Sequence, residues 1–422
     1  MFKTYLINTS SGQILAPIDI PSFSWKVTVS RSNFITTKKG TFEEATINSG
    51  VQIPWEAIPG HGSNSKSRLY IDSYTNGIVM TWQSPYSGEE WPVLYGAIGD
   101  RKDTYEDTSF NILSIMDLLG ERILVPEKSF GFDPIKGTLA EASNNENQLT
   151  HVGTTSAEIK FNNRSWRAIL ANVGKLCTDA KPNGDLPIDW DYFNEQGAQE
   201  IKFEGFDVKN NNCARIFDNI ANRLGGPDVQ FRPYFKDSST IRVKFIAGSD
   251  ADHHIPQFTK PVELNSFRGG GSIDNLAVGF KAGVSRVYGT GAGKDKAMLC
   301  CLAERIDGRD PRLVHPLIEK TSLNGEASSY ETLRDKTEAE LALRCLPVMQ
   351  VAGDINANDS DLIAPGRFWP GELVHVTIED FPSLNDDVYT LRLMEMSGDA
   401  SGKVHLVFDT AADPGLISTV RS

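Results

Sequence analysis

The chain has 422 residues, with 42 Lys and Arg against 55 Asp and Glu, and a formal net charge of −13 at pH 7. This acidic balance argues against nucleic-acid binding as the main function, because nucleic-acid-binding surfaces are basic and neutralise phosphates. Hydrophobic residues make up 40% of the chain and charged residues 23%, as in soluble globular proteins. The length predicts about two to four domains.

No stretch of the sequence has the pattern of a membrane span or a secretory signal. The apolar runs are shorter than the roughly 18 residues that cross a bilayer. The first residues, MFKTYLINTSSGQ, turn polar too early for a signal peptide. We therefore expect synthesis in the cytoplasm and no membrane segment.

The first part of the chain, residues 1–107, is predicted to be a small β-barrel domain. Apolar and polar residues alternate over several short stretches, as they do in half-buried strands. The predicted strands are 4–7, 23–29, 68–74, 77–82 and 91–98. Gly12 fits a turn, and Asn76-Gly77 fits a tight hairpin turn. Short strands with turn signals between them favour a small barrel.

The second part, residues 108–254, is predicted to be an α+β domain. Its centre is a short amphipathic helix with Asn211 or Asn212 as N-cap, stopped by Gly225-Gly226-Pro227 and followed by a hairpin of residues 229–245. The helix stripe consists of Ile216, Phe217, Ile220, Ala221 and Leu224. Further helices are predicted at 108–119 and at 165–178, the latter capped by Ser165, and 126–147 is predicted to be an exposed excursion.

The remaining residues are predicted to form a second β-barrel domain, 255–298 and 364–422, with an inserted helical domain, 299–363. The insert contains the clearest helix, 329–346, which we expect to begin with a capping box of Ser328 and Glu331. Its expected buried stripe is Tyr330, Leu333, Thr337, Leu341 and Cys345. Strands are predicted within 258–290 and at 371–378, 388–395 and 403–408. We expect 388–395 to be an exposed edge that is available for subunit pairing.

Glycines near residue 290 resemble a phosphate-binding loop only superficially. A P-loop has the pattern G-x-x-x-x-G-K-[ST]. Here Asp295 follows Lys294, and Tyr288 stands where the first glycine belongs. The spacing of Gly289, Gly291 and Gly293 also fails the dinucleotide-binding pattern. A flexible hinge leaving a strand is the preferred interpretation.

Two further sets of residues contain potential metal ligands, but neither has the spacing of a known metal site. Asp250, Asp252, His253 and His254 lie together in sequence, but adjacent histidines point apart and no distant ligand pair completes a known spacing. The five cysteines, an odd number without C-x-x-C spacing, indicate neither a zinc site nor a disulfide framework. Buried free thiols are the preferred interpretation. They are Cys177, Cys213, Cys300, Cys301 and Cys345.

Tryptophans and paired carboxylates could indicate sugar binding or catalysis. Four tryptophans in the first part of the chain could hold a sugar, but core or interface positions are the preferred interpretation. These are Trp25, Trp55, Trp82 and Trp91. The carboxylate pairs Glu89-Glu90 and Asp386-Asp387 fit solvated turns. The sequence therefore predicts a protein that is not an enzyme, with no catalytic residue, no cofactor and no metal.

Several stretches together resemble the minor tail proteins of long-tailed phages of actinobacteria that act as the baseplate hub. The first three are SFSWKVTVS, VQIPWEAIPG followed by residues 77–96, and DLLGERIL. The others are GGPDVQFRP, VYGTGAG, SYETLRDKTEAELALRCLP and PGELVHVTI. The resemblance covers nearly the whole chain and rests on structural patterns.

The resemblance implies a four-domain tail-hub fold similar to that of contractile-tail baseplate hubs, mainly β with α+β, in which each of two barrels is combined with an α+β or helical domain. It implies a homotrimer at the distal end of a siphophage tail, part of the virion. Expected partners are the distal tail protein ring, the tape measure protein and other tail-tip or receptor-binding proteins. Genomic DNA would pass through without specific binding during ejection, along a wall that we expect to be acidic. Longer relatives continue into an enzymatic or fibre domain.

Two other functions stay open on the sequence alone. One is a tail-tip enzyme that degrades cell-wall polysaccharide or peptidoglycan, with Trp55, Trp82 or Trp91 holding the sugar. The other is a host carbohydrate-binding adhesin without catalysis. Turnover of cell-wall polymer would favour the enzyme, and direct binding of the isolated chain to host cells would favour the adhesin.

Overall fold

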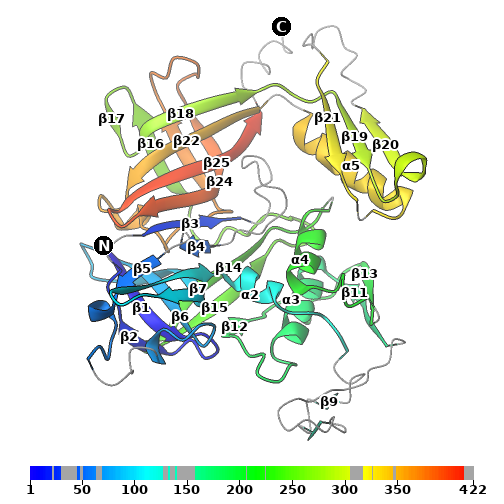
Figure 1. Cartoon of the computed structure of the whole chain (residues 1–422). Coiled ribbons are helices and arrows are strands. Elements are labelled where there is room, and N and C mark those ends of the chain that lie inside the picture. The colour runs from blue at the N-terminus through cyan, green and yellow to red at the C-terminus, as the bar shows by residue number, and fades with distance from the viewer. Residues whose placement is uncertain are drawn as a thin grey trace.

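The structure of the chain is a computed structural model, and it is mainly β with α+β parts, as predicted (Figure 1). The residues that it describes are 1–20, 23–29, 45–47, 51–62, 69–126, 132–133, 138–139, 157–205, 207–223, 225–304, 317–325, 327–345 and 348–412.

The first part of the chain forms a six-stranded sheet with the order β2-β1-β6-β7-β8-β5. Its strands are β1 (Phe2–Asn8), β2 (Ile14–Pro17), β5 (Val51–Pro54), β6 (Asn76–Gln83), β7 (Glu90–Asp103) and β8 (Asp107–Leu113). Neighbouring strands are antiparallel. The order ends on β2 and β5, which are not paired with each other within the described residues. Strand pairing there gives an open sheet, and the predicted closed barrel is not observed.

Two predictions around residue 75 are wrong. Residues 69–75 form a helical turn and a tight turn instead of a strand, and Tyr74 adopts a positive φ of 60°. Polar side chains stabilise this turn, because Thr75 donates to Asp72 and the backbone N–H of Asn76 donates to the Asp72 carbonyl. Asn76 and Gly77 then belong to β6, so they do not form the hairpin turn.

The predicted helix at 108–119 divides into strand β8 and a shorter helix, α2 (Ile115–Gly120). Phe110 and Ile112 are both buried and lie two residues apart, which is the period of a strand. Ser114 forms a capping box with Asp117 and begins the helix there. The helical spacing of apolar residues across this boundary was therefore misleading.

The helices predicted at 165–178 and after Asn212, and the hairpin that follows them, are observed. Its elements are β11 (Glu158–Arg164), α3 (Trp166–Cys177), β12 (Ile188–Asp189), β13 (Gln199–Glu204), α4 (Cys213–Ala221), β14 (Val229–Asp237) and β15 (Thr240–Ala247). Ser165 caps α3 by accepting from the Ala168 N–H, and Asn212 caps α4 by accepting from the Arg215 N–H. Leu224 and most of 126–147 lie outside the described residues. Within that excursion, β9 (Phe132–Asp133) pairs with β10 (Thr138–Leu139).

The C-terminal part forms a nine-stranded sheet with the main order β17-β16-β23-β24-β25-β22-β18. The seven strands of this order are β16 (Val262–Phe267), β17 (Gly270–Gly271), β18 (Asp274–Lys281), β22 (Val348–Asn356), β23 (Leu373–Ile378), β24 (Asp387–Asp399) and β25 (Lys403–Ala412). Strand β22 lies inside the stretch predicted to be a helical insert. Strand β24 pairs with β23 through residues 387–392 and with β25 and β3 through residues 393–399. The expected edge at 388–395 is therefore covered at 393–395, whereas 388–392 pair with β23 alone among the described strands.

A strand from the first part of the chain completes this C-terminal sheet. Strand β3 (Ser24–Thr28) pairs with β24, with Trp25 opposite Gly398, and on its other side with β4 (Ala45–Ile47). The two sheets therefore share one hydrophobic core, in which Trp25, Trp82 and Phe408 are each at most 1% exposed. Figure 1 shows β3 and β4 between the first sheet below and the C-terminal sheet above.

The last unit is a three-stranded sheet of order β20-β19-β21, on which helix α5 packs, at the upper right of Figure 1. Its elements are β19 (Arg286–Thr290), β20 (Cys300–Glu304), β21 (Glu319–Leu323) and α5 (Tyr330–Arg344). The N-cap is Ser329, which accepts from the Thr332 N–H, instead of the predicted Ser328. Leu333 and Thr337 are buried as predicted, whereas Tyr330 is exposed.

Gly289 serves close packing, because it lies inside β19 against α5. A Cβ atom at this position would stand 2.0 Å from the Thr337 hydroxyl oxygen and 3.1 Å from the Cys301 sulfur. The prediction of a flexible hinge is therefore wrong at Gly289. It is a strand position at which only glycine allows the helix to approach.

Replacing Gly289 with alanine is expected to lower the free energy of unfolding by about 1–3 kcal/mol, because the added methyl group overpacks the β19–α5 contact. Chemical denaturation measures the change. Gly279→Ala is the matched control, since nothing lies within 4 Å of a Cβ there. Equal effects of the two substitutions would contradict this packing role.

A cluster around Asp354 stabilises the far end of the C-terminal sheet. Asp354 accepts from Asn275 at 2.8 Å and lies 2.7 Å from His405 Nδ1 and 3.0 Å from Lys403 Nζ. Burial alone would raise the pKa of Asp354, but the hydrogen bonds from Asn275, His405 and Lys403 outweigh it and lower the pKa to about 2.

Because the folded-state pKa lies below the unfolded one, Asp354 stabilises the fold above about pH 4, and this contribution disappears as the pH falls toward 2. Asp354→Asn is expected to lower the free energy of unfolding by about 2 kcal/mol at pH 6 and by nearly nothing at pH 2. Denaturant titrations at a series of pH values test this. A difference between variant and parent that does not change with pH would refute the assignment.

Candidate functional site

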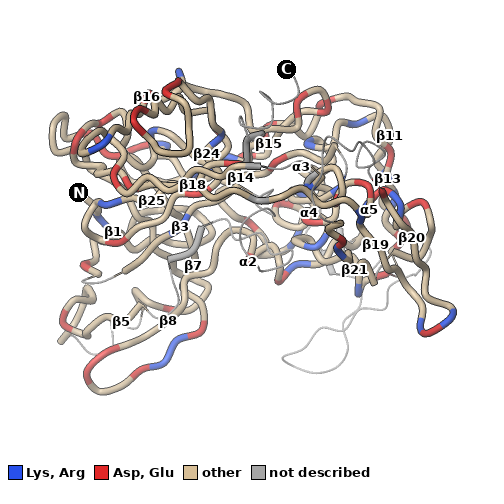
Figure 2. The backbone as a smooth tube through the Cα atoms, turned by 90° about the horizontal axis from the view of Figure 1, so that it is seen from above, with Lys and Arg blue, Asp and Glu red and all other residues tan. Residues whose placement is uncertain are grey.

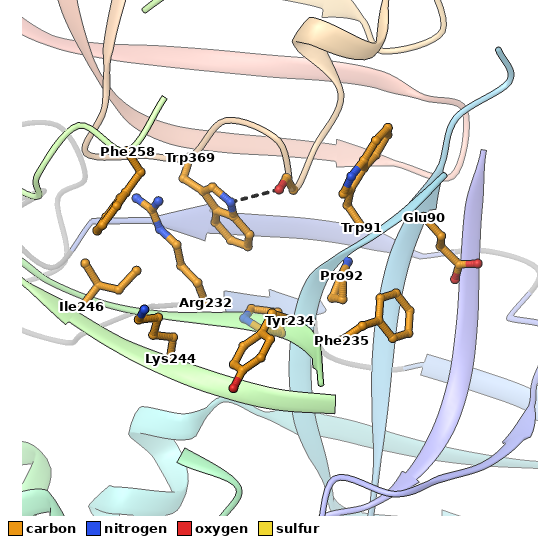
Figure 3. A pocket seen from close by; sticks show the side chains of 12 residues that line it. Glu90, Trp91, Pro92, Arg232, Tyr234, Phe235, Lys244, Ile246, Phe258 and Trp369 are labelled. Atoms are coloured by element: carbon orange, nitrogen blue, oxygen red, sulfur yellow. Dashed lines mark hydrogen bonds between the residues drawn. The ribbon is translucent and has the colours of Figure 1, made fainter. Parts of the chain in front are cut away.

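A pocket of about 410 Å³ lies where the first sheet, the α+β part and the C-terminal sheet meet (Figure 3). We call it the junction pocket. It is lined by Glu90, Trp91 and Pro92 of β7, Arg232, Pro233, Tyr234 and Phe235 of β14, Lys244 and Ile246 of β15, and Phe258, Gly366 and Trp369. Aromatic side chains from three parts of the chain therefore surround one hollow.

A buried ion pair lies beside the junction pocket and includes Arg232, one of the residues that line it. Arg232 Nη1 lies 2.6 Å from Glu372 Oε1, and the two side chains are 9% and 2% exposed. Arg232 also donates through Nε to the Gln230 side chain at 2.6 Å. Burial lowers the pKa of Arg232 from its ordinary value, while the charge of Glu372 opposes that shift. The pair joins β14 to the segment that leads into β23.

Guanidinium groups cover the aromatic rings of the pocket. Arg232 stacks on Trp369 at 5.3 Å and on Phe258 at 5.4 Å, and Arg367 stacks on Trp91 at 5.1 Å. The indole N–H of Trp369 donates to the Gly366 carbonyl, as the dashed line in Figure 3 shows. Stacking of a desolvated guanidinium on an indole contributes about 1–2 kcal/mol. The Arg232–Trp369 contact holds the loop before β23 against β14, and the Arg367–Trp91 contact holds it against β7.

The same network reaches strand β3. Gln230 donates from its side chain to the Thr28 carbonyl at 3.4 Å, next to its contact with Arg232. Gln230 and Arg232 are 1% and 7% exposed. Because β3 belongs to the first part of the chain and Glu372 to the last, β14 connects both ends of the molecule.

The ionisable side chains that line the pocket all have partners. Glu90 accepts from Thr81 and lies 3.6 Å from Lys3 Nζ. The Tyr234 hydroxyl donates to Asp189, and Lys244 lies 3.3 Å from Asp191. A pocket of stacked aromatic rings and neutralised charges is suited to holding an apolar or aromatic group.

The tryptophans singled out in the sequence do not form one platform. Trp25 and Trp82 are buried in the shared core. Trp55 is half-buried, and its indole N–H donates to the Thr104 carbonyl at 2.9 Å. Trp91 is opposite Trp82 in the first sheet and lies at the rim of the junction pocket. Core and interface positions thus account for Trp25, Trp82 and Trp91.

The acidic and histidine residues near position 252 are engaged separately. His254 Nδ1 lies 3.1 Å from Asp228 Oδ2, whereas Asp250 accepts from the Trp166 N–H and from Gln199. Asp252 accepts from the backbone N–H of His254. Across the part of the chain that the structure describes, no group of three or more His, Cys, Asp or Glu is placed to hold a metal ion.

The cysteine prediction holds for only some of the thiols. None of the five forms a disulfide, and Cys177 and Cys213 are buried in the α+β part. Cys301 and Cys345 are partly buried, and Cys300 is exposed. The difference arises because Cys300 points to the face of the three-stranded sheet that α5 does not cover.

The sequence is not matched by any protein-family model or by any curated protein. Among solved structures, a tail protein from Neisseria meningitidis is similar with 10% identity and a TM-score of 0.47, covering 96% of each chain. The prophage MuSo2 43 kDa tail protein from Shewanella oneidensis is similar with 10% identity and a TM-score of 0.47, covering 98% of this chain and 99% of its own.

A prophage tail protein from Listeria monocytogenes is similar with 10% identity and a TM-score of 0.41, covering 99% of this chain and 97% of its own. These similar structures are tail proteins, and similarity at this level assigns neither a family nor an activity. Of the helices that the structure describes, none is long and apolar enough to span a membrane.

Proposed function

We propose that the chain is a non-enzymatic structural protein of the virion, a homotrimeric baseplate hub at the tail tip of a siphophage. It would join the distal tail protein ring to the tip proteins and the tape measure protein. It would also form or close the passage through which DNA leaves. The four predicted domains would supply two barrel-like units per subunit, giving a ring of six in the trimer.

The observation that carries this proposal is the common core of the two β sheets. Strand β3 pairs with β24, and the Arg232–Glu372 pair fixes β14 against the same sheet. Such interlocking makes the first and last parts of the chain one body, as a mechanical adapter requires. The stretches of sequence that resemble tail-hub proteins lend independent support.

The proposal predicts where the protein is found. Purified virions should contain it at the tail tip, which antibody labelling in electron microscopy detects. Particles made without the gene should lack a complete tip and fail to infect. A protein that is absent from virions, or present only in infected-cell lysate, would contradict the proposal.

A tail-tip hydrolase is the main alternative. Incubating the purified chain with host cell-wall polymer should release no soluble fragments if the protein is a hub. Release of fragments would favour the enzyme instead. Binding of the isolated chain to intact host cells without release would favour an adhesin.

A further inference from the structure

A tyrosine stands fully exposed at the tip of the β7–β8 hairpin. Residues 104–106 connect the two strands, and Tyr105 has no part of its side chain covered. The hairpin extends away from the body beside β5 and carries charges of both signs near its tip (Figure 2). Tyrosine is enriched among the residues that anchor protein interfaces.

Hydrogen bonds hold the tip in one conformation. The Thr104 hydroxyl accepts from the N–H groups of Glu106 and Asp107, and the Thr104 N–H donates to the Asp107 carbonyl at 2.8 Å. The Trp55 indole N–H donates to the Thr104 carbonyl from outside the hairpin. Tyr105 is therefore presented by an ordered turn, so that little conformational entropy is lost when it binds a partner.

The same strand carries a candidate receptor for this side chain. Strand β7 begins with Glu90 and Trp91 at the junction pocket and ends with Asp103 beside the tip. Its 14 residues span about 45 Å when extended, so the tip lies far from the pocket of its own chain. A side chain at one end and a hollow at the other allow head-to-tail contact between identical copies.

Charge and size favour this match. Glu106 follows Tyr105 directly in the tip, and the guanidinium of Arg367 lies over Trp91 beside the pocket. Opposite charges at a contact of this kind steer association and fix its register. A hollow of about 410 Å³ that is lined by stacked rings can admit a phenol ring.

We infer that Tyr105 of one copy inserts into the junction pocket of a second copy, with Glu106 next to Arg367 of that copy. This inference rests on the proposed hub and names the contact between its subunits. The contact is heterologous, and such a contact closes into a ring of three when the rotation between neighbouring copies is one third of a turn.

Light scattering after size exclusion of the full-length chain, over a range of concentrations, tests the contact. Tyr105→Ala should weaken self-association at least tenfold, as loss of an interface anchor does. Tyr330→Ala is the matched control, because Tyr330 is also exposed but lies on α5. It should leave self-association unchanged.

A charge exchange tests whether the two predicted surfaces touch. Glu106→Arg and Arg367→Glu should each weaken self-association, and the double variant should restore it, because the pair is re-formed with reversed signs. Circular dichroism checks that each variant is folded.

If Tyr105→Ala associated as strongly as the parent chain, the inference would be overturned, and the hub would then use another contact. A chain that stays monomeric at every concentration would also overturn it, since the contact needs only copies of this chain. Virion labelling tests the tail location separately from both results.

Discussion

Replacing Glu372 with alanine is expected to lower the free energy of unfolding by about 3–5 kcal/mol, because it leaves Arg232 charged, buried and without its carboxylate. The side chains of Arg232 and Glu372 are only 9% and 2% exposed, so water cannot replace the lost partner. The stacking of Arg232 on Trp369 and Phe258 should loosen as well. Denaturant unfolding measures the loss.

Two controls distinguish the effect of breaking the Arg232–Glu372 ion pair from the effect of removing a glutamate at any position. Glu379→Ala, at an exposed position just after β23, should change stability by less than about 0.5 kcal/mol. The double replacement Arg232→Met with Glu372→Leu should recover most of the loss, because no unpaired charge stays buried. A double variant as unstable as Glu372→Ala would show that the charges themselves are not the cause.

Replacing Trp25 with alanine is expected to cost about 3–5 kcal/mol, because it removes a large side chain from the core shared by both sheets. Trp25 is 1% exposed, and its ring contacts Phe2 edge-on at a centroid distance of 5.5 Å. Since Trp25 also lies opposite Gly398, the pairing of β3 with β24 should weaken. Amide hydrogen exchange should accelerate at residues 395–399.

The half-buried Trp55 provides the comparison. Trp55→Ala should cost about 1–2 kcal/mol, since it loses one hydrogen bond and partial burial. Exchange at residues 395–399 should then stay slow. If both substitutions accelerated exchange there equally, β3 would not be the element that joins the two sheets.

The sequence correctly predicted the elements whose capping residues and apolar spacing lie within a few residues of one another. Helices α3 and α4 begin at the capping residues Ser165 and Asn212, as expected. Helix and strand were confused at 108–119, because Phe110 and Leu113 fit a helical period while Ser114 starts a new element. Spacing alone cannot separate the two when a strand runs directly into a helix.

The junction could not be predicted from local patterns. In β14, Gln230 and Arg232 occupy the positions that alternate with Val229 and Phe231, where polar residues normally face water. They are buried because the C-terminal sheet covers that side, and the partner of Arg232 lies 140 residues away. A single sequence contains no signal that pairs Arg232 with Glu372.

The pairing of β3 with the C-terminal sheet could not be predicted for the same reason. The alternation of Trp25 and Val27 correctly predicted a strand, but it carries no information on which strand becomes its neighbour. The same limit applies to the edge expected at 388–395, where β23 pairs with the first residues and β25 and β3 pair with the last ones.

The most direct test of the central claim is the native mass of the purified chain, measured by light scattering after size exclusion, alone and with the distal tail protein. The proposed hub predicts a mass near three subunits, reached by the chain alone and retained when the ring protein binds. A monomer under both conditions would contradict a trimeric hub.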